Sequence, residues 1–199
     1  MDPGGRLRQR IPIQWSPIES LAALDTDQRV LYMGSFSKVL YPGLKLGYLV
    51  VPRGLAESLK QAHYELNRPG LIPLQAALAE FIEMGHFATA LRDARQSYGE
   101  RRRCLLEALE PCLGARAQIS GTEQGLHLCV NLPTALDDKA LAQRIGAMGL
   151  TVRPLSAYCI RRTDLRGIVI GYGYAPLAEI QRYGPILAKA ISAALARVT

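Results

Sequence analysis

Residues 34–48 read GSFSKVLYPGLKLGY, and this stretch decides how the chain is interpreted. It follows a short apolar, β-prone run at 29–33 and leads into a second apolar run at 46–51. Neither run alternates between polar and apolar residues, which is typical of strands buried on both faces of a sheet. Tyr-Pro-Gly at 41–43 predicts a turn between them. The sequence therefore predicts two strands joined by a loop that carries Lys38.

Lys38 lies at the end of the first predicted strand, beside small hydroxyl residues and seven positions before a second cation, Lys45. A lysine held in a partly dry pocket loses its proton readily, and its amine can form an imine with an aldehyde. The hydroxyl of Ser35 and the ammonium of Lys45 would suit a phosphate group. Ser-x-Ser-Lys alone, however, also fits a surface turn with a solvated lysine, so both interpretations stay open at this point.

The composition is that of a folded protein. Of the 199 residues, 49% are hydrophobic and 21% charged, which excludes a disordered chain. The formal charge of +7 fits either an anionic partner or a soluble surface rich in arginine, and the scattered basic residues favour the second. No apolar run is long enough for a membrane span, and no signal-peptide pattern is present, so we expect a cytoplasmic protein with no membrane partner.

The four cysteines, which are Cys104, Cys112, Cys129 and Cys159, show no metal-ligand spacing. Free cysteines within apolar runs pack like small hydrophobic residues. We therefore expect four reduced thiols and no metal site.

Helical periodicity covers much of the remaining sequence. It predicts helices at 54–67, 74–84 and 87–109, the last stopped by Pro111, followed by helices at 139–148 and from Pro176 onward, with a kink or break at Pro185. Strands are predicted at 118–120, 126–132, 151–154 and 167–173. This order predicts an α/β chain with three parts: residues 1–84, a linking helix over 85–112, and a small α+β domain over 113–199.

The 34–48 stretch resembles the pyridoxal-phosphate lysine segment of fold-type I aminotransferases of class I/II. It is most similar to the aminotransferase-like domain of MocR-type regulators of the GntR family, in which a strand leads into (S/T)-F-S-K and then P-G-L-R-L-G-Y. The segments 85–102, 125–128, 152–156 and 170–172 resemble the interdomain helix and the small-domain strands of that group. The resemblance extends over nearly the whole chain from about residue 18.

This resemblance implies the C-terminal part of a fold-type I transferase, made of a remnant of the large-domain sheet and the small α+β domain. It implies that pyridoxal 5'-phosphate is the cofactor, that Lys38 forms the internal aldimine, and that Ser35 and Lys45 contact the phosphate, with Ser37 nearby. A ligand carboxylate would be bound by an arginine of the small domain. Four arginines are candidates, and the sequence does not choose among them: Arg153, Arg161, Arg162 and Arg166.

The chain departs from the pattern in three ways. Lys45 replaces the usual arginine, which keeps the charge but loses the bidentate fork, and Ala90 stands where the subgroup commonly has histidine. The aspartate, asparagine, tyrosine and stacking aromatic residue that the family places before the lysine cannot be located within residues 1–34. We therefore expect an incomplete large-domain sheet with exposed apolar edges at Leu31, Met33, Leu49 and Val51.

Three functions remain open on this evidence. The chain could belong to a transaminase acting on an amino acid or amine, with Lys38 as the general base. It could instead be the cofactor- or effector-sensing domain of a homodimeric transcriptional regulator that contacts DNA only through another domain. The third alternative is a truncated remnant that is inactive by itself.

Overall fold

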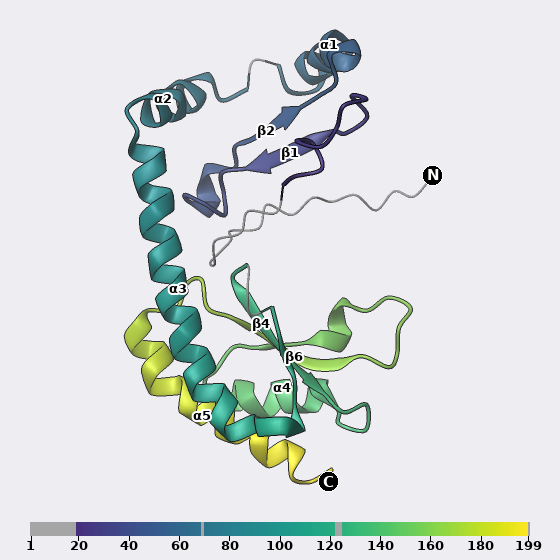
Figure 1. The fold of residues 1–199 in the computed structure, drawn as a ribbon, viewed down its shortest axis with the longest axis vertical. Coiled ribbons are helices and arrows are strands. Elements are labelled where there is room, and N and C mark those ends of the chain that lie inside the picture. The colour runs from purple at the N-terminus through teal and green to yellow at the C-terminus, as the bar shows by residue number, and fades with distance from the viewer. Residues whose placement is uncertain (1–18, 69, 122–124, 199) are drawn as a thin grey trace. The chain divides into compact units, whose positions relative to one another are not determined.

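The computed structural model describes residues 19–68, 70–121 and 125–198, which form two compact units (Figure 1). Among these residues, the first unit extends to Ala94 and the second begins at Arg95. The boundary falls inside the long helix α3 (His86–Leu113), which was predicted over 87–109. The three-part domain division predicted from the sequence stays a prediction.

The first unit contains a pair of antiparallel strands followed by helices. Strand β1 (Tyr32–Ser35) pairs with β2 (Gly47–Val50), with Tyr32 opposite Val50 and Ser35 opposite Gly47. Helices α1 (Ala56–Asn67) and α2 (Ile72–Glu83) follow, and the first turns of α3 complete the unit. Both predicted strands are confirmed, although the first begins three residues later than expected.

The strand pair of the first unit is not buried. Among residues 19–94 of the described chain, only Gly34 is buried. Met33 and Leu49 lie opposite each other on one face with 66% and 48% of their surface exposed, and Val50 on the other face is 54% exposed. The prediction that these strands are buried on both faces is therefore wrong for the described chain. Both faces are apolar as predicted, but no described element covers them.

The prediction of exposed apolar edges is confirmed at three of its four positions. Leu31, Met33 and Leu49 are exposed, whereas Val51 is half-buried. A two-stranded sheet with no hydrophobic cover is marginally stable in water. The first unit therefore lacks the burial that would stabilise it as an independent domain.

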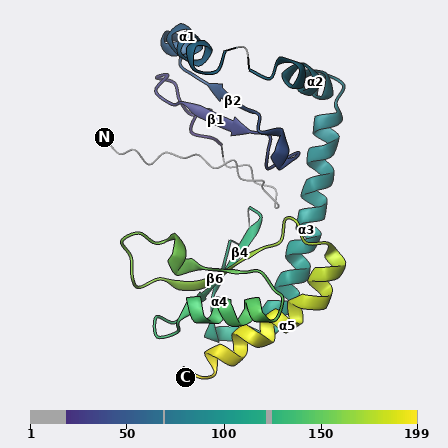
Figure 2. The same cartoon turned by 180° about the vertical axis from the view of Figure 1, so that it is seen from behind.

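The second unit is built on a four-stranded antiparallel sheet in the order β3-β4-β6-β5. Its two central strands, β4 and β6, are labelled in Figure 2. These strands are β3 (Ile119–Ser120), β4 (His127–Leu132), β6 (Arg166–Gly171) and β5 (Arg153–Pro154). The helices of this unit are α4 (Asp138–Ala147), α5 (Leu177–Leu195) and the last turns of α3.

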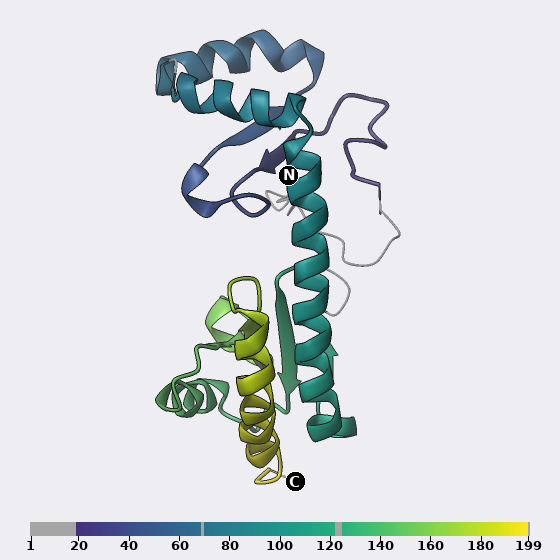
Figure 3. The ribbon, with the colours of Figure 1, turned by 90° about the vertical axis from the view of Figure 1, so that its left-hand side faces the viewer.

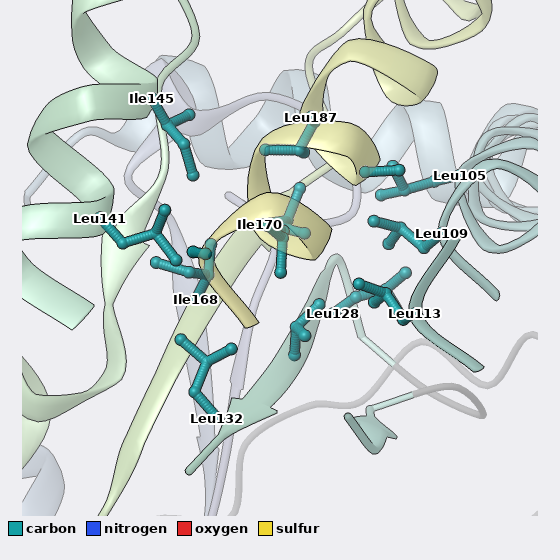
Figure 4. Close-up of a cluster of buried hydrophobic side chains, with 14 of the residues drawn as sticks. Leu105, Leu109, Leu113, Leu128, Leu132, Leu141, Ile145, Ile168, Ile170 and Leu187 are labelled. Atoms are coloured by element: carbon teal, nitrogen blue, oxygen red, sulfur yellow. The ribbon is translucent and has the colours of Figure 1, made fainter. Parts of the chain in front are cut away.

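One face of this sheet forms the hydrophobic core (Figure 4). Leu128 and Val130 of β4 lie directly opposite Ile170 and Ile168 of β6, and all four are buried. The helices cover this face with buried leucine and isoleucine side chains at helical spacing, among them Leu105, Leu109, Leu113, Leu141, Ile145, Leu187 and Ile191. All the buried hydrophobic side chains of the described chain belong to this cluster.

Helix α5 packs closely against α3 at Gly184 (Figure 3). A Cβ atom at this position would lie 3.1 Å from the Cβ of Ala108, which is tighter than ordinary side-chain packing. The small residues at 184 and 108 therefore set the approach of the two helices.

Two helices continue through prolines that were predicted to interrupt them. Helix α3 passes Pro111 and ends two residues later, so the proline removes a backbone hydrogen bond only from the final turn. Helix α5 passes Pro185 without a break, because buried residues on both sides of it, such as Ile180 and Leu187, hold the helix against the sheet.

We expect limited digestion with trypsin to cut the first unit first. Its lysines and arginines, such as Lys38, Lys45 and Lys60, are exposed on elements that bury no hydrophobic side chain. Mass spectrometry should identify a resistant fragment that begins before or within α3 and retains the second unit. A resistant fragment from the first unit, with the second digested early, would contradict the prediction. As a control, Leu109→Ala should remove the resistance, since large-to-small changes at buried leucines cost about 2–5 kcal/mol.

Tyr172 should make the second unit sensitive to alkaline pH. The phenol is fully buried, and its O–H donates to the carbonyl of Gly125 over 2.6 Å. Burial raises the pKa of Tyr172 to about 12, so the folded state disfavours the phenolate. This contribution to stability is complete below the unfolded-state pKa of about 10 and is lost as the pH rises from there toward 12.

Urea unfolding at several pH values, followed by circular dichroism, measures this effect. Between pH 10 and 12 the free energy of unfolding should fall more steeply for the natural chain than for Tyr172→Phe. Tyr174, which is 81% exposed, provides the matched control, since Tyr174→Phe should retain the natural pH dependence. Parallel curves for the natural chain and Tyr172→Phe would show that the phenol does not contribute.

Candidate functional site

The segment between β1 and β2 is a closed loop. The strand ladder ends with Ser35 opposite Gly47, and the next backbone N–H, that of Phe36, donates to the carbonyl of Leu46 over 3.0 Å. These contacts hold residues 36 and 46 together, so Lys38 and Lys45 lie in one short loop whose ends are fixed to each other.

The turn at Lys38 is organised around Phe36 and Ser35. The backbone N–H groups of Val39 and Leu40 donate to the carbonyl of Phe36 over 3.1 and 2.8 Å, and the N–H of Ser37 donates to Oγ of Ser35 over 3.3 Å. The two serines are half-buried, whereas Lys38 is exposed. The described residues therefore do not form the partly dry pocket that the sequence predicted around this amine.

Lys45 has an unusual backbone conformation. It follows the 3-10 helix Pro42–Leu44 and has φ of 48° and ψ of 26°, in the left-handed region. Residues other than glycine rarely adopt this region, and they persist there only where the surroundings impose it. The hydrogen bond from Leu44 N–H to the Tyr41 carbonyl precedes it, and the contact between residues 36 and 46 follows it. Gln28 and Arg68 have a similar positive φ, of 55° and 53°, so this conformation by itself does not mark a functional position.

Aromatic rings form the support beneath the loop. The ring of Tyr48 lies over Gly34, where a Cβ atom would be only 2.2 Å from the tyrosine Cζ. The rings of Phe36 and Tyr48 are 5.5 Å apart between centroids, and Phe36 meets Phe87 of α3 edge to face at 5.7 Å. Residue 34 must therefore be glycine for this packing to form.

The four candidate arginines all lie in the second unit, and they differ in their exposure and in their hydrogen-bond partners. Arg153, Arg161 and Arg162 are exposed, and Arg162 forms a bidentate contact with Asp164, whose pKa it lowers to about 2. Arg166 is half-buried at the first position of β6, where its Nη1 donates to the carbonyls of Thr163 and Leu165 over 2.8 and 2.9 Å. Arg166 is thus the only half-buried arginine of the four, and in the described chain no carboxylate forms a hydrogen bond or ion pair with it.

The sequence analysis missed the buried carboxylate of Asp138. This residue is 1% exposed, and its side chain accepts hydrogen bonds from Ser156 and Gly167. Burial alone would raise the pKa of Asp138, but these hydrogen bonds and the nearby charge of Arg166 lower it overall, so the carboxylate is held in its charged form. In the sequence it resembles an ordinary first-turn aspartate of a helix, beside the true N-cap Asp137.

Other types of site are not found in the described chain. Residues 19–68, 70–121 and 125–198 contain no cluster of three or more histidine, cysteine, aspartate or glutamate residues that could hold a metal ion. No helix within these ranges is long and apolar enough to cross a membrane. The four cysteines are free thiols, as predicted.

Comparison with known proteins finds relatives among transcriptional regulators and solved structures among aminotransferases. A scan against protein-family models gives no match. The chain is 34% identical over 156 residues to the probable rhizopine catabolism regulatory protein MocR of Rhizobium meliloti, covering 78% of this chain and 32% of that protein.

Two solved structures share the fold. The multiple substrate aminotransferase of Thermococcus profundus matches with a TM-score of 0.83 and 25% identity, over 94% of this chain and 46% of that one. The α-aminoadipate aminotransferase LysN of Thermus thermophilus, complexed with N-(5'-phosphopyridoxyl)-L-leucine, matches with a TM-score of 0.81 and 23% identity, over 94% and 48%. The chain therefore spans about a third of the regulator and about half of each aminotransferase.

Proposed function

Because this chain is homologous to MocR-type regulators and to aminotransferases, and has part of the fold-type I aminotransferase fold, we propose that it binds pyridoxal 5'-phosphate through Lys38. In this proposal it is the aminotransferase-like domain of a cytoplasmic, homodimeric regulator whose ligand is an amino acid or amine. Contact with DNA would be made by another part of that protein.

One observation carries the proposal: four groups of matching chemistry lie close together in sequence, at the last residue of β1 and in the closed loop that follows it. Lys38 offers an exposed amine for the cofactor aldehyde, while Ser35 and Ser37 offer hydroxyl groups, and Lys45 offers a second positive charge. A phosphate takes both hydroxyl donors and a point charge, so this donor set fits the cofactor.

Each residue of the loop has a defined task in this proposal. Lys38 would hold the cofactor through its Nζ and would serve as the base that takes and returns a proton at the ligand's α-carbon. Ser35 Oγ and Lys45 Nζ hold the phosphate and thereby fix the position of the cofactor relative to Lys38. The cofactor, when bound, supplies the electron sink for this chemistry.

We further propose that Arg166 binds the ligand carboxylate. Its guanidinium is ordered by two backbone carbonyls, and the other well-ordered candidate, Arg162, is already occupied by Asp164. A guanidinium retains parallel N–H donors for a carboxylate after one nitrogen has been used. The phosphopyridoxyl-leucine held by LysN supports an amino acid as the ligand class.

A sensing role is favoured over turnover by the greater identity to the regulator MocR than to the aminotransferases. Both roles use the same contacts and differ in whether the ligand is released unchanged. Incubation of the chain with cofactor and amino acids, followed by analysis for the corresponding keto acids, separates them. Keto-acid formation would favour the transaminase, whereas binding without conversion would favour the sensor.

Reduction with borohydride in the presence of pyridoxal 5'-phosphate should label Lys38 irreversibly. Peptide mapping should find the phosphopyridoxyl group on the peptide containing residue 38, and Lys38→Arg should remove the label. Lys60, which is also exposed but lies on α1 beside Glu57, serves as the internal control. A label on Lys60 or Lys139 in place of Lys38, or no label, would overturn the proposal.

Replacement of Lys45 should change cofactor affinity in both directions. Lys45→Ala removes a charge-assisted contact to the phosphate and should weaken binding about tenfold or more. Lys45→Arg adds a second parallel donor and should tighten binding. Absorbance titration with pyridoxal 5'-phosphate measures both changes, with Lys60→Ala as the control. Equal affinity in the natural chain and both variants would show that Lys45 does not contact the phosphate.

A further inference from the structure

We propose that Asp138 is a positioning residue that fixes Arg166 for the ligand carboxylate by anchoring the start of β6. This inference rests on the proposed function, because it takes Arg166 as the carboxylate-binding residue. Asp138 itself would not touch the ligand.

The carboxylate of Asp138 joins two segments that are distant in sequence. Its Oδ1 accepts from Oγ of Ser156 over 2.6 Å, and its Oδ2 accepts from the backbone N–H of Ser156 over 2.9 Å and of Gly167 over 3.1 Å. Ser156 belongs to the 3-10 helix Leu155–Tyr158 after β5, and Gly167 directly follows Arg166. One buried charge thereby holds the end of β5 and the beginning of β6 together.

The sheet explains why Gly167 needs a side-chain acceptor. Asn131 of β4 lies opposite Gly167, and its N–H donates to the carbonyl of Gln118, on the side of β3. Residues 131 and 167 are therefore a pair that exchanges no hydrogen bonds, and the N–H of Gly167 points away from β4. On that edge β5 ends at Pro154, opposite Ile168, and has no residue opposite Gly167. Asp138 takes the place of the missing ladder partner at the residue next to Arg166.

Close packing leaves little freedom at this point. A Cβ atom on Gly167 would lie 2.9 Å from the carbonyl oxygen of Val130 and 3.1 Å from Sγ of Cys129.

The guanidinium of Arg166 donates to backbone carbonyls, and no ion pair between it and Asp138 is found among the described residues. Asp138 therefore acts on the backbone beneath the arginine and leaves the guanidinium available to a ligand.

Asp138→Asn is the informative substitution. The amide keeps the size of the side chain but replaces one acceptor oxygen with an NH₂ donor, which would face N–H and O–H donors that need an acceptor. Ser156→Ala is milder, since the carboxylate retains both backbone N–H contacts. Leu141→Ala on the same helix is the control for general destabilisation, because Leu141 is buried in the core and touches neither segment in the hydrogen-bond network.

Nuclear magnetic resonance of the intact chain provides two readouts. The arginine Nε–H resonance that disappears in Arg166→Lys reports binding of succinate, used as a carboxylate probe, and amide hydrogen exchange at Gly167 reports anchoring without any probe. Asp138→Asn should weaken succinate binding at Arg166 about five- to tenfold and accelerate exchange at Gly167. Leu141→Ala should leave the succinate affinity within about twofold of the natural chain.

The outcomes separate this inference from the proposed function. Natural succinate affinity together with natural exchange at Gly167 in a folded Asp138→Asn chain would overturn the positioning role alone. An equal loss of affinity in Leu141→Ala would show that Asp138 contributes only to stability. Absence of any succinate response at Arg166 in the natural chain would overturn both the arginine assignment and the inference, while borohydride labelling of Lys38 would still test the cofactor site.

Discussion

Burial of one face of the β3-β4-β6-β5 sheet is the interaction on which the ordered part of this chain depends. Every buried hydrophobic side chain of the described residues lies in that layer, where Leu128 and Val130 meet Ile170 and Ile168 beneath α3, α4 and α5. Hydrophobic burial is the dominant favourable term in folding, so the second unit holds nearly all the stabilisation that the described chain has. The described part of the first unit has regular secondary structure but contains no buried hydrophobic side chain.

This contrast bears directly on the proposed cofactor site. The loop that carries Lys38 and Lys45 is held by main-chain pairing and by the rings of Phe36, Tyr48 and Phe87, and not by a packed interior. Main-chain hydrogen bonds exposed to water contribute little net stability. The geometry of the loop is therefore specified locally, whereas its rigidity depends on whatever covers the apolar faces of β1 and β2.

The sequence predicted the positions of the helices and strands well, and the burial of their side chains less well. The leucines of α3 recur at four-residue steps and β4 and β6 are apolar runs, so the positions of these elements could be derived from local pattern. The prediction that β1 and β2 are buried on both faces was wrong, because the residue pattern shows which faces of a strand are apolar but not which element covers them. The predicted stop at Pro111 was two residues early, because this proline lies in the last turn of α3, where few backbone hydrogen bonds remain to be lost. The helix does not break at Pro185, because packing of the buried residues on both sides outweighs the local penalty. Lys38, Ser35, Ser37 and Lys45 could be predicted as site residues because they belong to one contiguous motif, whereas nothing contiguous in the sequence links Asp138 to Gly167.

Asp138 and Lys45 both break local rules, one as a buried charge and the other as a lysine with positive φ, and functional sites are where such exceptions are expected. The cost at Asp138 is offset inside the second unit, because two backbone N–H groups and a serine hydroxyl satisfy the carboxylate within a close-packed core. The backbone of Lys45 is held from both sides, by the hydrogen bond from Leu44 N–H to the Tyr41 carbonyl and by that from Phe36 N–H to the Leu46 carbonyl. Its positive φ is shared by Gln28 and Arg68, so the conformation alone does not indicate a ligand. The proposed phosphate contact at Lys45 therefore depends on the chemistry of the donor groups around the loop, which a charged ammonium and two hydroxyl groups supply.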